Sequence, residues 1–405
     1  MVIYKIAFRN IFRQKRRSIL TALTMLGGFV LASVAIGWAD GAYNHIINMF
    51  TRNRLGHIQI HAKGYLDKPS LYKNIDHVEQ LGKRIEQVEG VEAWSPRLYS
   101  VGLASVGEKS AAVRIIGIDP KRENKSTHFN RKVVEGESFS LNPAREVLMG
   151  KGLARILNAK TGDEVVIVSQ AADGSLANDL YRLNGIIQSG DDTQDSMAFY
   201  LHLSDAQELL VMEDRVHEIV IIAEDLDKVR ALSRDITNSI QNPDLAVAPW
   251  QEFAKSFYNA MKADKRGNWI MIFTIILIVA IGVLNTVLMA VLERQREYGL
   301  LKAIGTRPKQ ILLLVLYEVN MLAVLSIIIG SGLACLANNW LSWHGISLSE
   351  PFSYGGMTFK TMYAEINVQS FLIPAIAVLG TACLVSFLPA LKAARTDPAK
   401  TMRNV

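Results

Sequence analysis

The chain has 405 residues, of which 50% are hydrophobic and 20% charged, and its formal net charge is +6. A composition this apolar argues against an ordinary soluble enzyme. The positive charge does not indicate nucleic-acid binding, because the large polar segment at residues 41–267 holds 28 Lys and Arg against 31 Asp and Glu. We therefore expect a membrane protein with no nucleic-acid partner.

The first 53 residues predict a basic segment followed by a membrane-spanning helix. Lys5, Arg9 and Arg13 recur at steps of four, a pattern typical of an amphipathic helix on the inner leaflet, although a plain positive flank explains it equally well. Residues 18–39 lack charge, and about 20 apolar residues suffice to cross a bilayer. This run exceeds the roughly 7 to 15 apolar residues of a cleaved signal peptide. The helix is expected to continue outward as a stalk to residue 53.

Residues 54–249 predict a large α+β domain of two lobes. Two strand-helix-strand patterns, one in residues 57–98 and one in residues 217–250, are expected to pair in one mixed lobe, as in split βαβ folds. The alternating apolar segments between them supply a second lobe.

This polar domain offers no convincing catalytic or metal site. The segment from Gly102 to Ser110 resembles a phosphate-binding loop, but Glu108 intrudes before the lysine, so a plain hairpin is the better interpretation. His57 and His61 are four residues apart on a predicted strand, which separates them by roughly 13 Å, too far to share one metal ion. Surface or strand-facing positions are expected for both histidines.

Three further spans follow, at residues 269–292, 311–341 and 368–391. Glu318 is the only charged residue in any of the four spans, so a polar conduit for ions is not expected. We interpret Glu318 as reaching toward the headgroups or packing, in preference to a proton site. Small residues at steps of four predict helix-packing faces; they are Ser326, Gly330 and Ala334, and Ser33 and Gly37.

Charge predicts the orientation of these spans. Lys and Arg number six in residues 1–17, five in 293–310 and four in 392–405, whereas the loop at 342–367 has only Lys360. Short loops rich in Lys and Arg stay in the cytoplasm. Both termini and residues 293–310 are therefore expected inside, and residues 54–249 outside.

The cytoplasmic loop has the most specific pattern. Leu300, Leu301 and Ile304 are expected on one helical stripe, which ends at Gly305 before a new helix starts at Pro308. Such a helix suits docking into a groove of a partner, although an ordinary positive flank is an alternative. The predicted organisation is 1–17 cytoplasmic helix, 18–53 first span and stalk, 54–249 external domain, 250–292 stalk and second span, 293–310 coupling loop, 311–341 third span, 342–367 external loop, 368–391 fourth span and 392–405 cytoplasmic tail.

Several motifs resemble one family from end to end. REYGLLKAIGTRPKQI and LPALKAARTDPAKTMR resemble the conserved loop and tail of the MacB/LolC/LolE/FtsX superfamily of ABC transporter permeases. Further matches are FRNIFRQKRRSILT, VRIIGID and EVLMGKGLARILNAKTGDEVVIV, and LGHIQIHAKGYLDKPSL looks like LolE-type permeases. LolC and LolE are the nearest analogy within the superfamily. Met402 stands where the family usually has leucine.

The resemblance implies a permease without catalytic residues or cofactor of its own, in a bacterial inner membrane. A separate dimeric ATPase that binds ATP and Mg would clamp the coupling helix and drive changes outside the membrane. A second permease copy or sibling, a lipoprotein or other lipid-linked substrate, and a periplasmic carrier or adaptor are the further partners implied. Acyl chains would enter near Met25, Phe29 and Ile36. The coupling helix implied consists of Arg296, Glu297, Tyr298, Gly299, Leu300, Leu301, Lys302, Ala303, Ile304 and Gly305.

Two alternatives within the family remain open. One is a MacB-like exporter of peptides or drugs that uses a periplasmic adaptor, and the other is an FtsX-like regulator of cell-wall hydrolases. The external loop at 342–367 has aromatic residues around a Gly355-Gly356 hinge, and it either touches the stalks or substrate or forms an aromatic belt.

Overall fold

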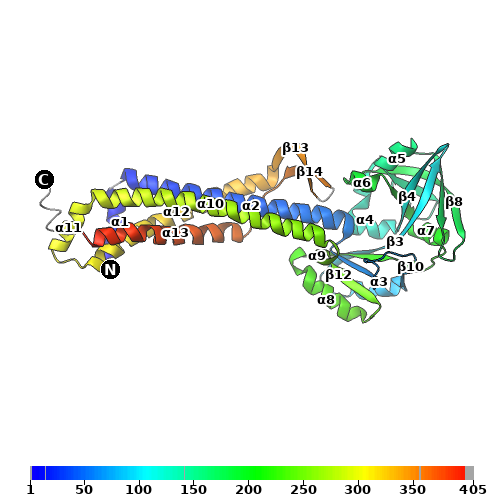
Figure 1. Ribbon diagram of the computed structural model, residues 1–405, viewed down its shortest axis with the longest axis horizontal. Helices are drawn as coiled ribbons and strands as arrows, with labels where there is room; N and C mark the ends of the chain where they lie inside the picture. The colour runs from blue at the N-terminus through cyan, green and yellow to red at the C-terminus, as the bar shows by residue number, and fades with distance from the viewer. Residues whose placement is uncertain (1, 14, 141, 355–356, 397–405) are drawn as a thin grey trace. The chain divides into compact units, whose positions relative to one another are not determined.

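The computed structural model describes residues 2–13, 15–140, 142–354 and 357–396, and it divides into two compact units (Figure 1). The first, which we call the helical unit, comprises Met1–His45, Met261–Leu348 and Thr361–Val405. The second, which we call the sheet unit, comprises Ile46–Ala260 and Ser349–Lys360. Each is described by itself below.

Four long helices have the length and composition to cross a membrane, as predicted. The shortest has 26 residues, or about 39 Å at 1.5 Å per residue, which exceeds a hydrocarbon core of about 30 Å. The first continues past the apolar run to Phe50 and then into a π-helical turn (Thr51–Leu55), in agreement with the expected stalk. They are α2 (Lys15–Phe50), α10 (Lys255–Glu293), α12 (Pro308–His344) and α13 (Gln369–Ala394).

Small residues bring these helices close together, which confirms the predicted packing faces. Ser326, Gly330 and Ala334 are all buried on α12. A β-carbon at Gly330 would lie 2.8 Å from the ring of Phe29 on α2, and the hydroxyl of Ser326 donates a hydrogen bond of 3.0 Å to the carbonyl of Ala22. Lipid tails are as apolar as the helix surfaces, so the hydrophobic effect does not drive helices together inside a bilayer. Helices associate there through close packing at small residues, as seen here.

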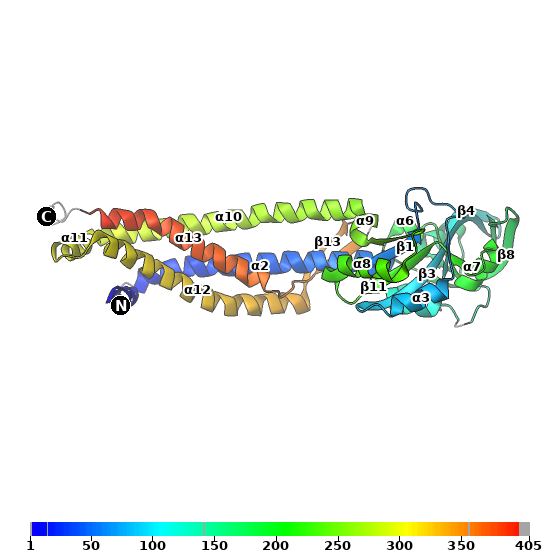
Figure 2. The same cartoon turned by 90° about the horizontal axis from the view of Figure 1, so that it is seen from below.

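Two short helices lie at one end of the helical unit, beside the C-terminal end of α13 (Figures 1 and 2). They are α1 (Val2–Arg13) and α11 (Gln295–Ala303). Helix α1 packs against α12 through the fully buried Ala7, while Phe8 and Phe12 are exposed. A helix is thus present in residues 2–13 of the predicted segment 1–17, whereas residues 15–17 belong to α2, and the place of α1 on the inner leaflet stays a prediction.

The segment at 342–367, expected as a loop, contains two paired strands. Helix α12 runs on to His344, and β13 (Ile346–Tyr354) and β14 (Met357–Met362) form a two-stranded sheet. The aromatic residues of this segment favour a loop at the membrane surface, whereas the alternation of its side chains suits strands. The Gly355-Gly356 hinge lies outside the described residues.

The sheet unit is built on one hydrogen-bonded path of strands in the order β12-β1-β11-β3-β4-β9-β6-β8-β5, with β7 joined to β3 and β8. Two further strands, β2 (Ile75–Asp76) and β10 (Arg215–Val216), pair with each other. The strands of the main path are β1 (Ile58–Ala62), β3 (Val91–Val106), β4 (Lys109–Ile118), β5 (Val133–Gly136), β6 (Glu146–Gly150), β7 (Glu164–Gln170), β8 (Leu176–Ile187), β9 (Ala198–His202), β11 (Glu218–Ala223) and β12 (Leu245–Pro249).

The two predicted strand-helix-strand patterns do pair with each other. The first is β1, α3 (Val78–Glu86) and β3, and the second is β11, α8 (Val229–Ile240) and β12. Strand β1 lies antiparallel to both β11 and β12, and β11 lies antiparallel to β3. The helices α3 and α8 pack together, each with its apolar side buried. A division of this unit into two lobes stays a prediction, because β3 continues without a break into pairing with β4 and β7.

Residues 102–110, which resemble a phosphate-binding loop in sequence, form part of a hairpin. Strands β3 and β4 pair from Val106 and Lys109 back to Arg97 and Ile118, and Gly107 takes a positive φ of 57° in the turn. The hairpin interpretation is therefore confirmed. The remaining helices of this unit are α4 (Pro120–Thr127), α5 (Lys151–Leu157), α6 (Asp192–Asp195), α7 (Leu203–Leu210) and α9 (Trp250–Phe253), with 3-10 turns at Phe129–Lys132 and Leu226–Lys228.

Candidate functional site

The coupling helix α11 has the ends that its sequence predicts. The chain leaves α10 at Glu293, and α11 ends at Ala303, two residues before Gly305, whose φ is +98°. That conformation favours glycine, since other residues are strained there. Helix α12 then starts with Pro308 in its first turn, where the missing backbone N–H costs nothing.

The apolar residues of α11 do not form the single stripe that was predicted. Leu300 and Ile304 are exposed, at 58% and 74% of their surface, whereas Leu301 packs against the core of the helical unit. The reason is geometric: positions 300 and 304 share one side of a helix, and position 301 is turned by about 100° toward the side of Tyr298. Tyr298 itself is 2% exposed.

A buried arginine joins this helix to the span that follows it. Arg294 donates to a carboxylate oxygen of Glu318 at 2.9 Å and to one of Glu297 at 2.9 Å, and its guanidinium lies 5.3 Å from the ring centre of Tyr298. The side chains of Arg294 and Glu318 are 7% and 15% exposed. Glu318 therefore pairs inside the protein and does not simply reach toward the headgroups. The sequence analysis missed this partner, although Arg294 is the first cation after the second span.

The other coupling residues either anchor the helix or leave it accessible. The ammonium of Lys302 donates to the carbonyls of Ala394 at 3.2 Å and Thr396 at 2.7 Å, at the C-terminal end of α13 where a cation is favourable. Gly299 is buried, and Arg296 and Ala303 are exposed. The result is a short helix fixed by Arg294, Tyr298 and Lys302, with Leu300 and Ile304 presented outward.

The three residues expected near an acyl-chain entrance lie in the interior of the helical unit. Met25 and Phe29 are fully buried and Ile36 is 4% exposed. By contrast, Leu23 and Leu31 on the same helix are 56% and 57% exposed. Contact of acyl chains with Met25, Phe29 and Ile36 stays a prediction, and in the chain by itself they act as core.

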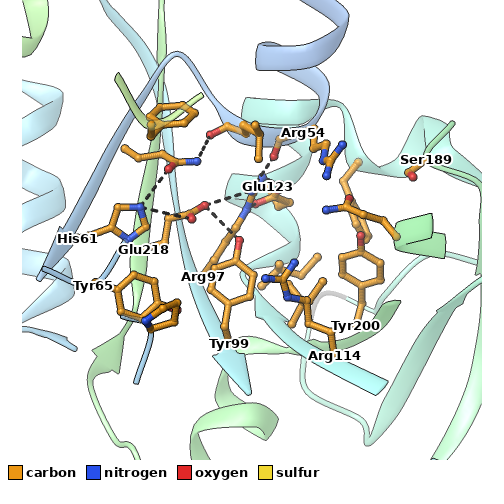
Figure 3. A pocket seen from close by; sticks show the side chains of 18 of the residues that line it. Arg54, His61, Tyr65, Arg97, Tyr99, Arg114, Glu123, Ser189, Tyr200 and Glu218 are labelled. Carbon is orange, nitrogen blue, oxygen red and sulfur yellow. Dashed lines mark hydrogen bonds and ion pairs between the residues drawn. The ribbon is translucent and has the colours of Figure 1, made fainter. Parts of the chain in front are cut away.

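A second candidate site is a cavity of about 290 Å³ in the sheet unit (Figure 3). Its walls come from the π-helical turn after α2, from β1, β3, β4, β9 and β11, and from helix α4 and the turn after it. Sequence reasoning did not find it, because its residues range from Arg54 to Phe253 and only the strand register brings them together.

A buried ion cluster forms one wall of this cavity. Arg97 donates to Glu123 at 2.6 and 3.2 Å and to Glu218 at 3.3 Å, and Tyr99 donates to Glu218 at 3.1 Å. Burial alone raises the pKa of Glu123, but the adjacent Arg97 guanidinium lowers it to about 2. The pKa of Tyr99 is raised by burial and by Glu218. Arg97 and Glu123 are thus held in their charged forms.

His61 on β1 and His57, the residue directly before this strand, are both buried, and each has its own partners. His57 accepts a hydrogen bond from the N–H of Ala223 at 3.0 Å, and burial lowers its pKa to about 4. His61 lies 3.0 Å from the carbonyl of His217 and 3.7 Å from Glu218. In the described part of the chain, no group of three or more His, Cys, Asp or Glu could hold a metal ion.

Comparison with known proteins gives two family matches. Residues 18–239 match the MacB-like periplasmic core domain, and residues 269–398 match the FtsX-like permease C-terminal region. The chain is 22% identical to the lipoprotein-releasing system transmembrane protein LolC of Neisseria meningitidis serogroup B, over 98% of each protein. It is 21% identical to LolE of the same kind of system from Haemophilus influenzae, over 82% of each. It is 24% identical to the macrolide export ATP-binding/permease protein MacB of Campylobacter jejuni, over 98% of this chain and 60% of that protein.

Proposed function

This chain belongs to the family of ABC transporter permeases that join a MacB-like periplasmic core domain to an FtsX-like permease region, and we propose that it transmits the work of a separate ATPase across the membrane. The resemblance drawn from its motifs is thereby confirmed. Its four apolar helices and its permease relatives indicate a multi-pass protein of the inner membrane.

The observation that carries the proposal is the construction of α11. Leu300 on this nine-residue helix and Ile304 directly after it are exposed, and contacts of Arg294, Tyr298 and Lys302 hold the helix to the rest of the helical unit. Two adjacent apolar side chains on an anchored helix suit insertion into a hydrophobic groove. A displacement of α11 would also be transmitted to α12 and α13, because charge-assisted contacts of Arg294 and Lys302 hold α11 to both helices.

The cargo that we propose is a lipoprotein or another lipid-linked molecule taken from the outer leaflet. This rests on the LolC and LolE relatives, whose names describe lipoprotein release, and LolC is similar along almost the whole chain. The spans suit such a role, because an ion pathway would require charged side chains inside them. Glu318 is the only charged residue in the predicted spans, and it is paired with Arg294.

Export in the manner of MacB is the second candidate. It is favoured by the match of 98% of this chain to the Campylobacter jejuni protein. The two readings differ in partners: lipoprotein release requires a soluble carrier for acylated proteins, whereas export requires an adaptor and an outer-membrane channel. An FtsX-like role in regulating hydrolases has the family match alone in its favour.

Affinity purification of the full chain in mild detergent, with identification of the proteins retained, tests the proposal. We expect an ABC ATPase to be retained by the wild type and lost from Leu300→Asp and Ile304→Asp, because a carboxylate cannot enter an apolar groove without a large desolvation cost. Ile304→Val is the matched control, since it keeps an exposed apolar side chain.

Two results would count against the proposal. One is the absence of any ATPase from the wild-type preparation. The other is equal retention of the ATPase by both aspartate variants when these fold normally. Folding is checked by the thermal unfolding midpoint, which should change little because both side chains are exposed. The proteins recovered beside the ATPase separate the two candidate cargoes: an acyl-protein carrier supports lipoprotein release, and an adaptor supports export.

A further inference from the structure

The cavity in the sheet unit has a mixed wall that the proposed function does not use. Phe129, Ile116 and Ile118 form an apolar part of it. Tyr200 and charged side chains, Arg97 and Arg114 among them, form another part (Figure 3). Four of its lining residues are Lys or Arg and two are Glu. Its volume of about 290 Å³ is near the lower end of the roughly 300–1,000 Å³ typical of ligand pockets, so the occupant would be small.

The acidic groups of this wall are already occupied. The Glu123 carboxylate accepts from Ser95, from Thr127 and twice from Arg97, which uses both of its oxygens fully. One oxygen of Glu218 accepts from Arg97 and Tyr99, and the other faces His61 at 3.7 Å. The carboxylates therefore have little capacity left to bind a cation or a hydroxyl group.

The donor groups of the wall, by contrast, have capacity left. Within the described residues, the hydroxyls of Tyr65 and Tyr200 make no hydrogen bond, and burial raises the pKa of each to about 12, so both remain O–H donors. The Nε of Arg54 is buried and has no hydrogen-bond partner in the described part of the chain, although its Nη1 is paired with Asp191 at 2.6 Å. Arg114 makes no ion pair with any residue that the structure describes, and its guanidinium lies 5.4 Å from the ring centre of Tyr99.

A surplus of donors selects a ligand rich in acceptors. Guanidinium and ammonium groups favour anionic oxygens in particular, and burial lowers the pKa of Lys132 to about 8, which a bound anion would reverse. The aromatic rings beside these donors favour a compact apolar or ring-shaped body. The buried cluster of Arg97, Glu123 and Glu218 fixes the wall, although burying such charges costs desolvation that an apolar core would avoid.

We propose that this cavity binds a small organic oxyanion, a phosphate ester or carboxylate, held by Arg54, Arg114, Lys132 and the hydroxyls of Tyr65 and Tyr200. The anionic oxygens lie among the cations and the phenol groups, and the organic body packs on Phe129 and the aliphatic wall. Phosphate esters reach such a domain either as soluble metabolites or as lipid headgroups. Their chemistry at the site is the same.

The test is calorimetric titration of phenyl phosphate into the full chain, purified in a neutral maltoside detergent. We expect saturable binding with one site per chain, and a roughly tenfold weaker Kd for Arg114→Gln and for Tyr200→Phe, as expected for loss of one hydrogen bond to a charged group. Both variants keep most of the side-chain volume. The matched controls are Arg155→Gln and Tyr72→Phe, at exposed positions of the same unit that do not line the cavity.

Absence of saturable binding at millimolar phenyl phosphate would overturn the proposal, and so would equal affinity in all four variants. Addition of phosphatidylglycerol to the micelles separates the two sources: a weaker apparent affinity for phenyl phosphate assigns the cavity to a lipid headgroup, and an unchanged affinity assigns it to a soluble ester. The titration needs no ATPase, so its failure does not bear on the proposed permease function.

Discussion

At the scale of single residues, the pair formed by Arg294 and Glu318 is expected to matter more for stability than any surface ion pair. Both side chains are largely buried. Removing one member leaves a charge without a partner, at a cost of about 3 kcal/mol. We expect Arg294→Gln and Glu318→Gln each to lower the thermal unfolding midpoint in detergent, and the double variant to lose less than the sum of the two.

The ion pair of Arg17 and Glu293 provides the matched control. It joins the same end of the helical unit, but its side chains are 24% and 49% exposed. Solvent screens such a pair, so Glu293→Gln should cost at most about 1 kcal/mol. Strictly additive effects at Arg294 and Glu318 would show that the two side chains do not interact.

Glu123 should make the sheet unit sensitive to acid. Its pKa falls from an ordinary 4.5 to about 2 in the folded protein. Between these values the unfolded chain takes up a proton that the folded chain does not, so stability is present above pH 4.5 and is lost as the pH falls toward 2. Of a total effect of about 3 kcal/mol, about 2 kcal/mol should be lost between pH 6 and pH 3. Unfolding midpoints of the full chain at pH 6, 4 and 3 measure it.

The variant Glu123→Gln has no carboxyl group to titrate. It should be less stable at pH 6, because Arg97 then lacks its closest counter-ion, and its midpoint should fall less between pH 6 and pH 3 than that of the wild type. Parallel pH profiles for the two proteins would show that Glu123 is not the group responsible.

Residue types alone could not have predicted these pairings. The sequence marks Glu318 as exceptional, since it is the only charge in the four predicted spans, but its partner lies 24 positions away, on the far side of helix α11. Likewise Arg97 gains its two carboxylates from α4 and β11, which are distant along the chain. A local sequence pattern does not show which distant side chain will lie next to a given charged residue in the folded protein.

At the scale of secondary-structure elements, two adjacent glycines of α2 should behave in opposite ways. A β-carbon at Gly28 would overlap the side chain of Val279 on α10, and valine is stiff in a helix. A β-carbon at Gly27 would have nothing within 4 Å. We expect Gly28→Ala to cost about 1 to 3 kcal/mol through overpacking, and Gly27→Ala to stabilise by up to about 1 kcal/mol. Thermal unfolding midpoints measure both, and equal shifts would contradict this packing.

Elements with a strong local signal were predictable. The four long helices follow from uncharged apolar runs, and the hairpin at Gly107 follows from its turn residues. Which side of α11 is buried was not predictable from the sequence. Leu300 and Leu301 are equally hydrophobic, and only the packing of Leu301 on the helical unit distinguishes them. The strands β13 and β14 were missed because aromatic composition was weighed above side-chain alternation.

At the scale of the whole molecule, the distribution of Lys and Arg predicts that α11 and the sheet unit lie on opposite sides of the membrane. Single cysteines introduced into a chain that lacks Cys335 and Cys383 test this prediction. Cys335 is replaced by alanine. Cys383 is replaced by serine, which can keep the hydrogen bond that Cys383 donates to Asn320. A membrane-impermeant maleimide should label Lys109→Cys in intact cells. It should label Arg296→Cys only after permeabilisation. Labelling of both positions in intact cells would remove the basis for coupling to a cytoplasmic ATPase.

The pairing of β1 determines when the sheet unit can finish folding during synthesis. Ile58 pairs with Ile221 on one side and with Pro249 on the other, so β1 emerges from the ribosome long before either neighbour. At about 5 to 20 residues per second, the wait is roughly 10 to 40 s. A nascent chain that stalls before Leu245 leaves β1 with an unpaired edge, which is a template for aggregation with another chain. The polypeptide therefore depends on uninterrupted elongation, and its vulnerable interval ends when β12 arrives.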